Sequence, residues 1–330
     1  MSGFRLAAAA CAALFAFAPL RADAWGTKAD GAVVRAAVGG LPDSVPAFVR
    51  ASADDIVTFD GQIVQLSGAG DSLAHDLGPA GFIALGDNGN VMGALPFSPL
   101  PANREDYDSA LRKAGFDEYK AGYLPYAIID GFQVVRDDFA YWRAIDVMAR
   151  TAKAPADRTY FSNLRSVREE MTVRDIGAWS HFVAAASSPL STSIHSDGWD
   201  KYSGSQGIRA RFETRFVNAA INDQIVAARM KAYASCGCTL DVETVTYIAA
   251  SNTFLERVYQ LNSIGAFDAA TAAGTRFVAD LLGAAGTELR NLIVRAWIES
   301  EDQSIGTPPV KVRDVESGSV VPERETLGGA

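Results

Sequence analysis

The chain has 330 residues, of which 48% are hydrophobic and 21% are charged, a balance typical of a globular protein with a large core. It carries 30 Lys and Arg against 39 Asp and Glu, and the formal net charge of -9 argues against a general electrostatic grip on nucleic acid. The chain has three histidines, His75, His181 and His195, so a site for several metal ions would have to be built mostly from carboxylates.

The first 24 residues have the three parts of a secretory signal. A short basic start precedes an apolar run from Leu6 to Leu20, and Ala22-Asp23-Ala24 supplies the small residues of a cleavage site. Cleavage there would make Trp25 the first residue of the mature protein. The apolar run is too short for a membrane-spanning helix, and no later stretch is long and uncharged enough. We therefore expect an exported protein, periplasmic or extracellular, with no membrane partner.

The first third of the mature chain predicts short helices and a long arm. A helix should end near Gly39-Gly40, and a second should follow the turn at residues 41–43. Residues 56–104 have little helical period and many Gly, Asp and Pro residues, so they predict an irregular arm with a hairpin turn at Asn88-Gly89. The acidic residues Asp54 and Asp55 lie at a predicted helix end, where carboxylates are usually solvated caps.

Helical signals dominate from residue 105 onward. The stretch EDYDSALRKAGF predicts a helix with a glycine stop, and Leu124-Pro125 predicts the start of a long helix. The apolar residues of 171–186 recur at helical spacing on most sides, which indicates a central helix. Further helices are expected over 207–233, 243–264 and 277–296, and a loosely packed tail over 306–330. The fold class is thus all-α, with a single domain over 25–305.

Beyond the signal segment the chain has two cysteines, Cys236 and Cys238, in the stretch SCGCT. A bridge between them, two free thiols, or half of a soft-metal site are the alternatives. We favour a turn that carries two free thiols, because no neighbouring residues complete a tetrahedral metal set.

Three places carry residues with chemical potential. His181 lies on the predicted central helix, Arg209 and Glu213 stand four apart on one helical face, and Asp54-Asp55 form an acidic pair. The ordinary interpretation is a hydrogen-bonded core histidine, a surface ion pair and a solvated helix cap. From these residues alone, no function more specific than that of an exported helical domain follows.

Together with Trp25, these places resemble the single-strand-specific zinc nucleases, the nuclease S-one/P-one family, whose helical fold is shared with zinc-dependent phospholipase C. The resemblance covers nearly all of the mature chain and is closest to bacterial members. Its motifs are WG at 25 and 26, LP at 41 and 42, HDLGPAGFIAL from 75, DEYKAGYLPYAIIDGF from 117, DFAYWR from 138, DIGAWSHFV from 175, SPLSTSIHSDGW from 188, RFETRFV from 211 and ELRNLIVRAWIES from 288.

The resemblance implies a trinuclear zinc cluster bound by an N-terminal Trp, histidines and carboxylates, which hydrolyses phosphodiester bonds of single-stranded DNA and RNA and phosphates of nucleotides. Matched residue by residue, this chain keeps a part of the ligand set: Trp25, Asp55 (less well Asp54), His181 and Glu213, with Asp30 in place of a histidine. Asp55 also stands where the family has its catalytic base.

The other ligand positions are lost, because Gly81, Ala185, Ser191 and Arg209 replace histidines or an aspartate. A family aspartate is also replaced by Ala84. The resemblance therefore implies no bound metal or at most one divalent ion, and lost or strongly impaired catalysis, so that the chain is expected to be a pseudoenzyme.

Two expectations follow from these replacements. A permanently charged guanidinium at Arg209 should replace part of the lost zinc charge beside Asp30, Asp55 and Glu213. The alternative to a weakened nuclease is a non-catalytic exported protein that binds nucleotides, phosphate esters, single-stranded nucleic acid or a protein partner. In that case Arg209 would receive the phosphate and Trp199 and Tyr202 would stack on a base, although core packing is the ordinary role of such aromatics.

Overall fold

The computed structural model describes residues 25–67 and 77–328. The predicted signal segment 1–24 and His75 lie outside these ranges. The described chain confirms the all-α prediction, because helices dominate it and the sheet is limited to one pair of two-residue strands.

The long helices form the frame of the fold. The elements are, in chain order, α1 (Thr27–Gly39), α2 (Ala47–Ala51), α3 (Ala53–Ser67), α4 (Leu77–Ala80), α5 (Arg104–Lys113), α6 (Glu118–Ala121), α7 (Leu124–Thr151), α8 (Pro155–Ala185), a π-helix η1 (Ala210–Phe216), α9 (Val217–Ala220), α10 (Asp223–Ala227), α11 (Leu240–Asn252), α12 (Leu255–Ser263), α13 (Ala272–Glu299), a 3-10 helix η2 (Ser300–Asp302), β1 (Ser304–Ile305), β2 (Val310–Lys311), α14 (Val312–Glu316) and α15 (Arg324–Gly328).

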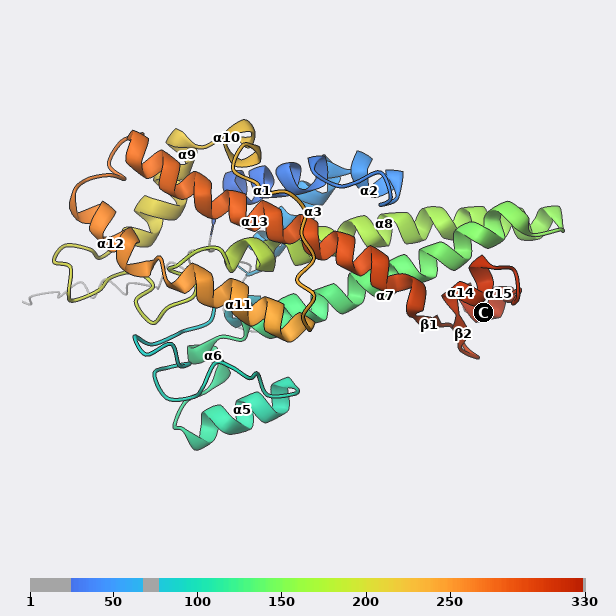
Figure 1. Ribbon diagram of the computed structural model, residues 1–330, viewed down its shortest axis with the longest axis horizontal. Coiled ribbons are helices and arrows are strands. Elements are labelled where there is room, and N and C mark those ends of the chain that lie inside the picture. The colour runs from blue at the N-terminus through green and yellow to red at the C-terminus, as the bar shows by residue number, and fades with distance from the viewer. Residues whose placement is uncertain (1–24, 68–76, 329–330) are drawn as a thin grey trace, which may run out of the picture.

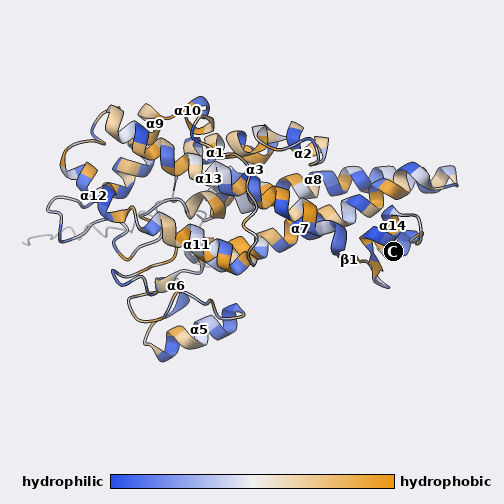
Figure 2. Cartoon of the chain, in the orientation of Figure 1, coloured by the Kyte–Doolittle hydropathy of each residue, from blue (hydrophilic) through white to orange (hydrophobic). Residues whose placement is uncertain are grey.

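Helices α7 and α8 form a long hairpin against which much of the chain packs. Figure 1 shows α13 running across this hairpin, with α1 and α3 beside it and α5 and α6 below. Hydrophobic residues recur along α7, α8 and α13 with hydrophilic residues between them (Figure 2). The predicted stripe on α8, which includes Ile176, Ser180 and Val183, is buried, as expected for a central helix.

Several predicted helix boundaries are confirmed. Helix α1 ends at Gly39, α7 starts at Leu124, and the turn after α5 has Gly115 at φ 87°. The hairpin at Asn88-Gly89 also forms, because Leu85 and Val91 pair as an antiparallel bridge and Gly89 takes φ 76°, a region that favours glycine.

Other predictions are wrong. The arm is not irregular from residue 56, because α3 extends to Ser67 and packs against α8. The segment 207–233 is not one helix but η1, α9 and α10 followed by an extended stretch.

The tail beyond residue 305 is also better packed than expected. Val312, Val315 and Leu327 are buried in a second hydrophobic cluster with residues of α7 and α8. Their irregular spacing in a polar segment hid this packing from a periodicity argument.

The two cysteines are not free thiols. Cys236 and Cys238 form a disulfide with Cα atoms 5.2 Å apart, within the usual range for such bridges. None of the helices in the described ranges combines the length and the apolar character that crossing a bilayer requires.

Candidate functional site

Three buried ionisable side chains from three helices meet in the core. Asp30 of α1, Asp60 of α3 and His181 of α8 are 1%, 1% and 4% exposed, and their potential ligand atoms all lie within 4.8 Å of one another. His181 Nδ1 lies 3.4 Å from Asp30 Oδ2, and the Ser180 hydroxyl donates to Asp60 Oδ1 at 3.1 Å. We call these three residues the acid–histidine group.

A glycine lets α3 approach α8 closely enough to form this group. A Cβ atom on Gly177 would lie 2.6 Å from Phe59 Cβ and 2.7 Å from the Ile56 carbonyl oxygen, so a side chain there would push the two helices apart. His181 lies one helical turn beyond Gly177, and Asp60 directly follows Phe59, so the two side chains come together. Close helix packing at Gly177 thus brings Asp60 to the histidine.

Asp55, the expected ligand and catalytic base, does not join this group. It is exposed in the first turn of α3, where its neighbour Asp54 pairs with Arg35 at 2.9 Å. The prediction for Asp55 therefore needs correction: α3 presents Asp60 to His181, five residues further on. Ile56 and Asp60 are four residues apart and lie on one buried face of α3. If the segment had been predicted as a helix, this spacing would have indicated that Asp60 is buried.

Trp25 is fully buried next to the end of α8. Its indole Nε1 donates to the Ser187 hydroxyl at 2.8 Å, and its ring lies 5.3 Å from the Phe212 ring. Trp25 thus directly precedes α1, which carries Asp30, and contacts η1, which carries Glu213. The role of Trp25 as a metal ligand stays a prediction.

Arg209 and Glu213 form a pair of a partly buried arginine and a fully buried acid, and not the surface pair of the ordinary interpretation. Arg209 Nε donates to Glu213 Oε2 at 2.8 Å, Ser188 donates to the other carboxylate oxygen, and the Glu213 side chain is fully buried. Burial raises the pKa of Glu213 to about 7, while the Arg209 charge and the hydrogen bonds from Ser188 and Arg209 oppose this rise. The pair lies at the π-helix η1, a form that is frequent at functional sites.

The residues that the family resemblance aligns with missing zinc ligands lie in different surroundings. Ala185 is buried and apolar, Gly81 is partly buried at the end of α4, and the buried Ser191 hydroxyl accepts a hydrogen bond from Arg209 Nη2 at 2.6 Å. The guanidinium of Arg209 therefore links Ser191 to Glu213.

A pocket of about 300 Å³ opens beside Arg209. Its lining includes Phe82, Ala84, Met92, Lys120, Ser193, Ile194, Ser196 and Arg209. The charged groups in this lining are the two cations, and two hydroxyls accompany them. We call this the Arg209 pocket, and its composition favours an anion.

Trp199 and Tyr202 do not line the Arg209 pocket. The His195 ring stacks on Trp199 at 4.3 Å, and Tyr202 stacks on Tyr259 at 5.4 Å. Both rings are partly buried against the main hydrophobic cluster, which is the ordinary packing role. Their expected stacking on a base is therefore at odds with the contacts that these rings already make.

The donor set does not fit a trinuclear zinc cluster. Within the described residues, the acid–histidine group offers one imidazole and two carboxylates, and Glu213 is occupied by Arg209 and Ser188. Two carboxylates and an imidazole do fit a single divalent ion, since borderline and hard cations accept both ligand types.

Comparisons with protein-family models, with curated proteins and with solved structures found no match. The fold and the site therefore define a class by their own features: a mainly helical domain with a buried acid–histidine group and a cationic pocket.

Proposed function

We propose that this chain is an exported, divergent member of the single-strand-specific zinc nuclease family that binds phosphate esters, above all nucleotides, with little or no hydrolysis. The observation that carries the binding part is the Arg209 pocket, where two cations and two hydroxyls line a cavity of about 300 Å³ in a protein whose net charge is -9. A local cationic site is what a phosphate requires when the protein as a whole repels it.

The two cations of the pocket have different roles in this proposal. Arg209 is held in place by Glu213 and Ser191, at 2.8 and 2.6 Å, so its orientation is fixed before a ligand arrives. Lys120 is 70% exposed and has Asp117 at 3.5 Å as its ion-pair partner, so its ammonium can move to a phosphate. Ser193 and Ser196 add hydroxyl donors beside them.

Weak or absent hydrolysis follows from the side chains at the ligand positions. Gly81 and Ala185 have no donor atom, and Arg209 is a permanent cation that excludes a metal from its own position. In this class of reaction, bound metal ions would activate the attacking water and stabilise the charge on the attacking and leaving oxygens. The chain offers at most the acid–histidine group for one divalent ion, with Asp30, Asp60 and His181 as the residues that would hold it.

The experiment combines binding, cleavage and metal content of the purified mature protein. Titration with adenosine 5′-monophosphate should show binding that weakens about tenfold in Lys120→Ala, because one charge-assisted contact is lost. Lys113→Ala, an exposed lysine of α5 outside the pocket, is the matched control and should bind as the wild type does.

Single-stranded DNA and RNA should be cleaved no faster with the protein than in the buffer control. Metal analysis should give at most one equivalent of a divalent ion. Three equivalents of zinc together with rapid cleavage would overturn the loss of catalysis. Equal affinity of the Lys120→Ala and wild-type proteins for the nucleotide would overturn the assignment of the pocket.

A further inference from the structure

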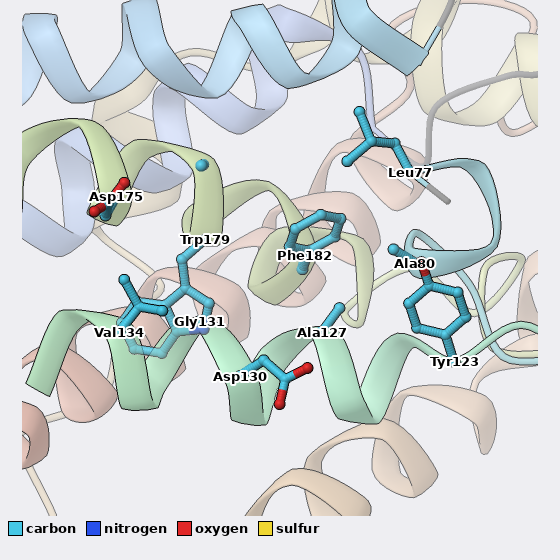
Figure 3. A pocket seen from close by; sticks show the side chains of 11 residues that line it. Leu77, Ala80, Tyr123, Ala127, Asp130, Gly131, Val134, Asp175, Trp179 and Phe182 are labelled. Atoms are coloured by element: carbon cyan, nitrogen blue, oxygen red, sulfur yellow. The ribbon is translucent and has the colours of Figure 1, made fainter. Parts of the chain in front are cut away.

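A second pocket lies between α4, α7 and α8, separate from the Arg209 pocket. Its volume is about 320 Å³, at the lower end of the range for small-molecule sites. Figure 3 shows Leu77, Tyr123, Trp179 and Phe182 around it, with Ala127 and Asp130 on α7. Most of the wall is thus aromatic or aliphatic, and an apolar body would bury its surface there.

The charged side chains of this wall are two carboxylates, Asp130 and Asp175. Asp175 is engaged, because Arg174 Nε donates to its Oδ1 at 2.8 Å. Asp130 is an exposed residue of α7 at the rim of the pocket, and among the described residues its carboxylate makes no hydrogen bond or ion pair. The charge of Arg104 acts on Asp130, but Arg104 Nη2 donates to both carboxylate oxygens of Glu118 at 2.9 Å, and the guanidinium lies 3.7 Å from the centre of the Tyr123 ring. Partial burial raises the pKa of Asp130, and the charge of Arg104 opposes this rise.

Because Gly131 has no side chain, the Trp179 ring can form one wall of the pocket. A Cβ atom on Gly131 would lie 2.2 Å from Trp179 Cδ1, so the indole can lie against α7 only because this residue is glycine. The Trp179 Nε1 donates to the Ile128 carbonyl at 2.9 Å, which satisfies the polar atom of the ring. The indole therefore contributes packing surface and no free donor, next to the residue that carries the carboxylate.

We propose that this pocket binds an organic cation: a protonated amine whose ammonium pairs with Asp130 and whose aromatic or aliphatic body packs among Tyr123, Trp179 and Phe182. An anion is disfavoured, because the lining carries two negative groups. A neutral ligand of the same shape would leave Asp130 without a partner. Aromatic rings near a desolvated ammonium add a further attraction. This site is independent of the Arg209 pocket and of the proposed function.

The test uses 2-phenylethylamine as the probe and 2-phenylethanol and phenylacetate as its neutral and anionic counterparts, with binding followed by calorimetry. We expect the amine to bind at least about tenfold more tightly than the alcohol, a difference of about 1.4 kcal/mol, and phenylacetate not to bind. Asp130→Asn keeps the shape of the side chain and should remove this preference for the amine. Asp137→Asn, an exposed position on the same helix, is the matched charge control and should keep it.

Ala127→Leu fills the pocket and should abolish binding of both the amine and the alcohol, with an unchanged circular dichroism spectrum as evidence of folding. Equal binding of amine and alcohol to the wild type, or an unaltered preference in Asp130→Asn, would overturn the proposal. Amine binding that survives Ala127→Leu would place the ligand elsewhere and would overturn it as well.

Discussion

The candidate site has two halves, the Arg209–Glu213 pair and the acid–histidine group, and their buried carboxylates have different partners. Glu213 has a permanent cation, Arg209, at 2.8 Å and a hydroxyl donor on its other oxygen. His181 Nδ1 lies 3.4 Å from Asp30 Oδ2, and Asp60 accepts a hydrogen bond from the Ser180 hydroxyl. A buried charge is costly unless it is paired. The comparison indicates that one half is stabilised by the protein's own cation, whereas the other keeps ligand atoms that a divalent ion can use.

The largest expected effect is on the half that contains the ion pair. Arg209→Ala leaves Glu213 buried without its cation and should lower the free energy of unfolding at pH 8 by about 3 kcal/mol. Chemical denaturation of the mature protein measures this. Arg215→Ala, an exposed arginine of the same π-helix, is the control and should change the stability little.

The double variant Arg209→Ala, Glu213→Gln distinguishes loss of charge pairing from loss of packing. Because glutamine needs no counter-charge, most of the stability should return in the double variant. A single variant as stable as the wild type would refute the idea that Arg209 compensates for lost metal charge.

The second expected effect is on the pH dependence of stability. The pKa of Glu213 is raised from 4.5 to about 7, so between these values the folded state holds a proton that the unfolded state has released. Stability therefore falls as the pH rises from 4.5 to 7, by an amount on the order of 3 kcal/mol. Glu213→Gln should flatten this part of the curve, as measured by denaturation at several pH values.

Glu288 provides a contrast outside the site. Burial and the charge of Glu243 raise its pKa to about 8, so Glu288→Gln should remove a slope that extends from 4.5 to 8 and should leave nucleotide binding unchanged. If the free energy of unfolding of Glu213→Gln depends on pH between 4.5 and 7 as the wild type does, then the titration of Glu213 does not explain this pH dependence.

Sequence reasoning found the frame of this fold because its signals are local. The buried stripes of α8 and α13 and the start of α7 at Leu124-Pro125 follow from residues within one or two turns. The partners of the site residues did not follow as well. That Asp30 faces His181, and that Ser191 and Ser188 meet Arg209 and Glu213, depend on how separate helices pack.

Asp60 illustrates the limit most clearly. The resemblance pointed to Asp55. The Gly- and Asp-rich composition of residues 56–104 predicted an irregular arm, so helical spacing was not used to find buried residues there. Only the approach of α3 to α8 at Gly177 decides which of the acids on α3 is buried. In the tail, likewise, Val312 and Leu327 were hidden by a polar segment whose burial depends on the surface of α7.

The smallest expected effect is on metal binding, and it distinguishes Asp60 from Asp55. If the acid–histidine group binds a divalent ion, then added Mn²⁺ or Zn²⁺ should raise the Tm of the chelator-treated wild type by a few degrees, because a ligand that binds only the folded state stabilises it. Asp60→Asn removes a charged ligand atom from the group and should abolish this rise. Asp55→Asn changes an equally charged residue on the same helix, but at an exposed position, and should keep the rise in full. A rise lost in Asp55→Asn and kept in Asp60→Asn would restore the assignment based on the family resemblance. No rise in the wild type would mean that the acid–histidine group, like the Arg209–Glu213 pair, does without metal.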